Sequence, residues 1–98
     1  MTAEKILEVT DFYREVLKRD PWASDNWLDY PPDRLLDLPE EGVRHCVLML
    51  DQIEDFARIG RLEKAFLWLG FVQGFFWATG RFTLDELKNH NRPEPAVD

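Results

Sequence analysis

Residues 65–79 read AFLWLGFVQGFFWAT, and this stretch decides the fold. Gln73 is its only polar side chain before the closing threonine, and glycines stand at positions 70 and 74. A helix that is apolar on every side has to be covered on every side. Lys64 and Arg81 bound the run, which is shorter than the roughly 20 apolar residues that cross a bilayer. We therefore expect no membrane partner, and a cover made of other helices, a second copy of the chain or a partner protein.

The length and composition predict one small domain. The 98 residues are 45% hydrophobic and 13% aromatic, which is enough for a real core. We expect residues 1–92 to form a single helical domain and the proline-rich residues 93–98 to be a frayed tail. The net charge of −7 repels phosphates, so no direct binding of nucleic acid is expected. A single cysteine, Cys46, and a start that does not read as a signal peptide predict a cytoplasmic protein.

The spacing of apolar residues predicts an all-α fold, a small helical bundle built on a long helix hairpin with an irregular aromatic loop. Helices are expected over residues 3–18, from 39 up to a break at 59–60, over 61–80 and over 84–89. Because the break at 59–60 is so short, the second and third helices are expected to form an antiparallel hairpin. Thr83 and Glu86 fit a capping box that begins the fourth helix. The third helix is expected at the centre of the fold.

Residues 20–38 have no helical period, because three prolines interrupt them. We expect an aromatic loop there, with at most one helical turn at 32–36. Seven acids between residues 20 and 41 accompany one base, Arg34. Aromatic residues are favoured interface anchors, and an acidic block complements a cationic partner. The predicted partner-binding surface is Trp22, Asp25, Trp27, Asp29, Tyr30, Asp33 and Asp37. The alternatives are that the aromatics cover the third helix and that the carboxylates belong to a solvated loop.

Glycine inside a helix costs up to about 1 kcal/mol relative to alanine, so Gly70 and Gly74 need an explanation. Two missing Cβ atoms on one face let another backbone approach closely. A self-association seam would consist of Gly70, Gln73, Gly74 and Trp77. The alternative is a close crossing with the first or second helix inside the monomer.

Three basic residues, Arg58, Arg61 and Lys64, recur at every third position across the turn between the second and third helices. They could hold an anion or an acidic partner. The alternative is a solvated rim that is paired with neighbouring acids.

No catalytic, cofactor or metal motif stands out. The pairs Glu41 with His45 and Glu86 with His90 have four-residue spacing, whereas di-iron bundles use Glu-x-x-His. The only serine, Ser24, has no recognisable base near it in the sequence. We therefore expect a protein that is not an enzyme and that needs no cofactor or metal ion.

A C-terminal pattern carries a resemblance to a known group of proteins. It consists of residues 68–74 (WLGFVQG), Trp77, Gly80, residues 83–87 (TLDEL) and residues 89–92 (NHNR). Over about residues 61–93 the chain resembles small uncharacterised proteins of tailed phages and prophages. The resemblance implies a small acidic protein that binds a host protein, for example as an inhibitor of CRISPR or another defence system, and it carries no active-site residues.

The expected function is therefore a non-enzymatic protein-binding module that modulates a host protein through the acidic and aromatic surface. A self-associating structural or assembly protein, with a homodimer formed through the face of Gly70 and Gly74, is the alternative.

Overall fold

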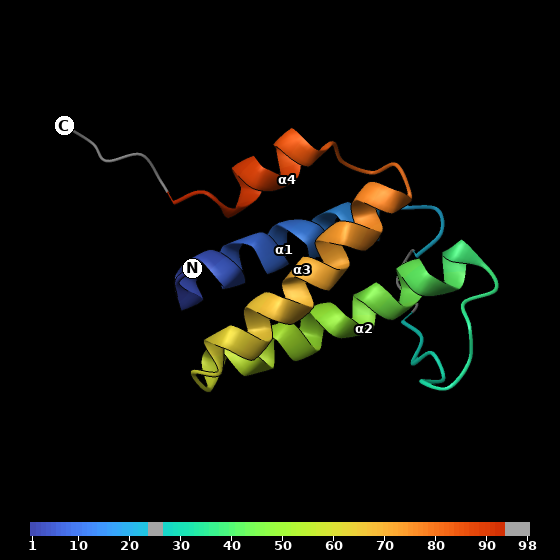
Figure 1. The fold of residues 1–98 in the computed structure, drawn as a ribbon, viewed down its shortest axis with the longest axis horizontal. Coiled ribbons are helices and arrows are strands. Elements are labelled where there is room, and N and C mark those ends of the chain that lie inside the picture. The colour runs from blue at the N-terminus through green and yellow to red at the C-terminus, as the bar shows by residue number, and fades with distance from the viewer. Residues whose placement is uncertain (24–26, 94–98) are drawn as a thin grey trace.

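The computed structural model describes residues 1–23 and 27–93. Four helices follow one another along the chain: α1 (Ala3–Lys18), α2 (Pro39–Arg58), α3 (Leu62–Ala78) and α4 (Leu84–Asn91). The helices α2 and α3 form the predicted antiparallel hairpin, α1 packs against both, and α4 lies along α1 (Figure 1). The predicted all-α fold is confirmed, with no strand in either described range. Residues 94–98 of the predicted tail lie outside the described residues.

The helix ends follow from local chemistry. The side chain of Thr2 caps α1 by accepting a hydrogen bond from the Lys5 amide at 3.1 Å. Thr83 and Glu86 form the predicted capping box, in which each side chain accepts from the backbone N–H of the other at 3.1 and 3.0 Å. Gly60 and Gly80 follow α2 and α3 with φ of +83° and +77°, a conformation that glycine adopts without strain.

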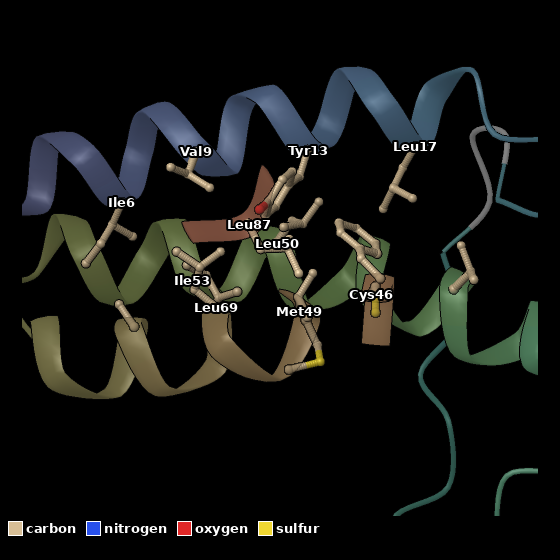
Figure 2. Packing of buried hydrophobic residues seen from close by; sticks show 14 of the residues in the cluster. Ile6, Val9, Tyr13, Leu17, Cys46, Met49, Leu50, Ile53, Leu69 and Leu87 are labelled. Atoms are coloured by element: carbon tan, nitrogen blue, oxygen red, sulfur yellow. The ribbon is translucent and has the colours of Figure 1, made fainter. Parts of the chain in front are cut away.

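The hydrophobic core lies between α1, α2 and α3, as Figure 2 shows. Its largest fully buried side chains are Tyr13 of α1 and Phe76 of α3, whose rings meet edge to face with centroids 5.0 Å apart. Each aromatic ring of this kind removes about 150–250 Å² from water, which gives a small domain a substantial core.

The centre of the fold is α2, and the prediction that the third helix occupies this position is wrong. Both α1 and α3 pack on α2, whereas α3 has one whole side that no other element contacts (Figure 1). Seven of the 20 residues of α2 are buried. Its polar residues are confined to the remaining face, as an amphipathic helix requires.

The loop before α2 is held along that helix by hydrogen bonds. The Leu28 amide donates to the Arg44 carbonyl at 3.2 Å, and the Tyr30 amide donates to Nδ1 of His45 at 3.1 Å. Instead of the helical turn expected at 32–36, residues 31–34 form one hydrogen-bonded turn, closed by the Arg34 amide and the Pro31 carbonyl at 3.3 Å. The loop therefore has a defined path against α2 without forming a helix.

The apolar helix α3 has 17 residues. None of the helices in the described ranges is long and apolar enough to span a bilayer.

Candidate protein-binding surface

The helix α3 presents apolar side chains on two opposite faces. On the inner face Ala65, Leu69, Val72 and Phe76 are all 0% exposed. The outer face has four large apolar residues in contact with solvent: Phe66 is 44% exposed, Leu67 66%, Phe71 58% and Trp77 54%. Residues three or four positions apart share a helix face, so these four surround Gly70 and Gly74. We call the six residues Phe66, Leu67, Gly70, Phe71, Gly74 and Trp77 the outer stripe.

The glycines of the outer stripe have no neighbour. A Cβ added at Gly70 or Gly74 would meet no heavy atom within 4 Å. The close crossing lies instead at Gly42 of α2, where a Cβ would be 2.9 Å from Cε2 of Phe75. The alternative in which these two glycines serve packing inside the monomer is therefore wrong.

Gln73 does not belong to the outer stripe, although the sequence analysis placed it in the self-association seam. Its side chain is 7% exposed and faces α1 and α4. Its Nε2 donates to the Tyr13 hydroxyl at 3.0 Å and to Oδ1 of Asn91 at 2.7 Å, and Nδ2 of Asn91 donates back at 3.0 Å. The glutamine thus fixes the register of contacts within one chain.

The same hydrogen-bond network constrains His90. The Tyr13 hydroxyl accepts from Gln73 and lies 2.8 Å from Nδ1 of His90, to which it can donate its own proton. In that direction of the hydrogen bond, Nδ1 is the acceptor and carries no proton. Burial lowers the pKa of His90 and raises the pKa of Tyr13 to about 12. The docked position of α4 therefore favours neutral histidine.

The loop before α2 borders one edge of the outer stripe. Tyr30, Pro32 and Leu36 line a groove of about 230 Å³ together with Phe71 and Phe75 of α3. This part of the loop supplies some of the cover for the third helix that was expected from the aromatic residues. The cover stops at the edge, since Phe71 is still 58% exposed.

The two ends of the α2–α3 hairpin differ in charge. At the turn between the helices, Arg61 and Lys64 lie over the Phe56 ring at 5.6 and 4.6 Å from its centroid. Neither residue forms a salt bridge within the described ranges, whereas Arg58 pairs with Glu54 at 3.0 Å. The solvated-rim alternative therefore fits Arg58 only, and the other two bases remain available.

The opposite end of the hairpin is acidic. Asp33, Asp37 and Glu40 are exposed just before and at the start of α2. Because Gly42 packs against Phe75, the start of α2 lies beside the C-terminal end of α3. The outer stripe therefore runs from an end of mixed charge, where exposed Asp55 and Glu63 accompany Arg61 and Lys64, to an acidic end.

The predicted partner-binding residues are spread over separate places. Trp22 is 39% exposed and lies under the Arg81 guanidinium, 4.8 Å from the ring centroid. Arg81 in turn binds both carboxylate oxygens of Asp20 at 2.7 and 3.0 Å. Burial opposes ionisation of Asp20, but the hydrogen bonds from Arg81 and the Trp22 amide, together with the charge of Arg81, lower the pKa of the carboxyl. Trp22 is thus part of an internal clamp.

The other members of that set face different elements. Trp27 is 59% exposed beside Lys18 and Val47, on the α1–α2 side of the molecule. Asp29 and Tyr30 line a cavity of about 590 Å³ on the α3 side. Asp33 and Asp37 are exposed at the acidic end. Asp25 lies outside the described residues.

Sequence reasoning missed Phe66, Leu67 and Phe71 as surface residues. All positions of residues 65–78 except Gln73 are apolar or glycine, so no contrast marks the solvent side. The one signal was the pair of glycines, which lie at the centre of the exposed face. Of the predicted seam, Gly70, Gly74 and Trp77 share that face.

The described residues contain no group of three or more histidine, cysteine, aspartate or glutamate residues arranged to hold a metal ion. Cys46 is buried, and burial raises its pKa to about 12, so the thiol is not a reactive thiolate. The outer stripe is therefore the strongest candidate site.

Comparisons of the chain with protein-family models, curated proteins and solved structures found no match. Function is therefore argued from the surface itself.

Proposed function

We propose that this chain is a non-enzymatic protein-binding module and that the outer stripe of α3 is its binding surface. The observation that carries the proposal is the exposure of Phe66, Leu67, Phe71 and Trp77 around two open glycines. At about 200 Å² per whole residue, these four expose about 450 Å² of largely apolar surface. An exposed apolar patch of this size is often functional in a monomeric protein.

The aromatic residues of the loop support the proposal less well. Interface energy usually comes from a few large side chains that become fully buried on binding. Trp22 already stacks on Arg81 within its own chain. Leu67 and Trp77 of the outer stripe have no such internal role. These side chains would therefore bury the most apolar surface on binding a partner.

Photo-crosslinking tests the proposal. A photoreactive phenylalanine analogue is placed at Leu67 or Phe71 and irradiated in expressing cells. Leu84 of α4 is the matched control, because it is an exposed apolar residue at 54%. We expect covalent protein adducts from positions 67 and 71 and none from 84. If positions 67 and 71 gave no adduct, or position 84 gave the same ones, the outer stripe would not be the binding surface.

A second candidate function is modulation of a host protein through the acidic residues of the loop before α2. It is favoured by Asp29, Asp33 and Asp37, which are exposed and take part in none of the salt bridges of the described ranges. The resemblance to small phage proteins, some of which inhibit CRISPR or other defence systems, points to the same class of partner. The triple variant Asp29→Asn, Asp33→Asn, Asp37→Asn should lose a host protein that the unchanged chain captures. Capture that survives this variant would remove these three carboxylates from the binding surface.

A further inference from the structure

The outer stripe has the shape of one half of a two-fold contact. Leu67 and Trp77 lie five residues on either side of its centre and Gly70 and Gly74 lie two, while Phe71 stands beside the centre at 58% exposure. A symmetric interface needs this kind of self-complementary surface. Building on the proposed function, we infer that the occupant of the outer stripe is a second copy of this chain. The two α3 helices run antiparallel, and the two-fold axis passes between Gly70 and Gly74.

Antiparallel pairing about this axis brings small residues together and staggers the large ones. Gly70 of one copy faces Gly74 of the other, which lets the two backbones approach closely. Leu67 faces Trp77 on either side of that crossing. Two such contacts form by symmetry, one on each side of the axis. Close approach at the glycines is what allows the flanking side chains to bury each other.

The charges of the hairpin select the antiparallel direction. A two-fold axis across the pair reverses one helix, so the turn of one hairpin lies at the same level as the acidic end of the other. Lys64 lies eight residues from the axis, about 12 Å along the helix, and its counterpart at that distance is the acidic end of the other copy. Lys64 of each copy then approaches Asp37 of the other. A parallel pair would bring the two acidic ends together, which is unfavourable.

The area available sets the expected strength. Adding Leu36, which is 44% exposed at the edge of the stripe, raises the apolar area to about 530 Å² per copy. Two copies then bury about 1,100 Å², which is at the low end for specific interfaces. We expect a dimer with a dissociation constant in the micromolar range, because small interfaces rarely bind more tightly.

Sedimentation velocity on the full chain between about 1 and 300 µM tests the contact, a range that spans a micromolar dissociation constant. We expect a shift from monomer to dimer as the concentration rises. Leu67→Glu and Phe71→Glu should each remain monomeric, because they bury a charge in the stripe, while Leu84→Glu should dimerise as the unchanged chain does. Circular dichroism confirms that each variant is folded. A chain that stays monomeric at 300 µM, or a dimer that both stripe variants leave intact, would overturn the inference.

Charge reversal tests the direction of the pair. Lys64→Glu should weaken the dimer about ten-fold, since two symmetric contacts change sign. Adding Asp37→Lys to the same chain should restore dimerisation, because each reversed pair is attractive again and the net charge returns to −7. Lys18→Glu on α1 is the control for net charge. If Lys64→Glu behaved like this control, or the double variant failed to recover, the antiparallel arrangement would be wrong.

The mass of the photo-crosslinked adduct separates the inference from the proposed function. An adduct of twice the chain mass supports a second copy. An adduct with a different protein, from a chain that is monomeric by sedimentation, would overturn the second copy and leave the proposed binding surface intact. No adduct at positions 67 and 71 would overturn both.

Discussion

The helices α1 and α3 both pack on α2, yet their solvent-exposed faces differ in composition. The exposed face of α1 carries charged residues, and its Arg14 binds Glu54 and Asp51 of α2 at 2.9 Å each. The exposed face of α3 has no charged residue between Lys64 and the end of the helix. The charged face of α1 is suited to contact with water, whereas α3 has the composition of a helix that is buried on both sides. This difference is the reason to regard α3 as incomplete in the monomer.

Two leucines of α3 provide the largest test of this contrast. Leu69 is 0% exposed on the inner face, and Leu67 is 66% exposed on the outer face. Leu69→Ala should lower the free energy of unfolding by about 2–5 kcal/mol, because it removes buried methyl groups and leaves a cavity. Leu67→Ala should cost less than about 1 kcal/mol at 1 µM protein, where the chain is monomeric. Urea denaturation measures both. Equal losses would show that the outer face is packed within the monomer.

The glycines give the next largest effect, and its sign differs between sites. Gly42→Ala should lower the free energy of unfolding by about 1–3 kcal/mol, because the new Cβ would collide with Phe75. Gly70→Ala and Gly74→Ala should each raise it by up to about 1 kcal/mol at 1 µM protein, since alanine favours the helix and meets no neighbour.

The same two alanine variants separate monomer stability from association. In the antiparallel dimer the added methyl groups push the two α3 backbones apart, so Gly70→Ala should weaken dimerisation while it stabilises the monomer. Thermal unfolding at low concentration and sedimentation at high concentration measure the two quantities. A loss of stability at Gly70 or Gly74 at 1 µM would show that these glycines are packed inside the chain.

The fold was predictable because its signals are local. Thr2, the capping box of Thr83 and Glu86, and the short break at 59–60 act through groups only a few residues apart. Apolar spacing in α1 and α2 identifies the buried face, since the other face is polar. In these segments the contrast between apolar and polar residues identifies the buried face without any knowledge of the tertiary structure.

The candidate surface was less predictable because α3 lacks that contrast. The positions of α1 and α2 determine whether Leu67 or Leu69 is buried. The apolar run itself does not distinguish the two leucines. Trp22 was predicted to bind a partner, but it stacks on Arg81 of its own chain. The two positions are far apart in the sequence, so the sequence does not indicate this contact. Gln73 was misassigned for this reason as well, since its partners Tyr13 and Asn91 come from two other helices.

The smallest effect concerns the place where α1, α3 and α4 meet. The pKa of the partly exposed His90 is lowered first by burial and further by Lys5, while Glu86 opposes the shift. Between its folded and unfolded pKa values the unfolded chain binds more protons, so the free energy of unfolding rises with pH. The contribution is complete above the unfolded value of about 6.5 and is lost as the pH falls toward the folded value.

Urea denaturation at 1 µM protein between pH 7 and pH 5 should therefore show a gradual loss of stability that His90→Asn reduces. Asp20 and Glu54 have lowered pKa values, so their losses occur at more acidic pH and do not obscure this range. The outer stripe contains no titratable group, and stripe variants such as Leu67→Ala should keep the pH dependence of the unchanged chain. A slope that disappeared with Leu67→Ala instead of His90→Asn would mean that the outer face, and not the inner junction, carries the proton-linked contact.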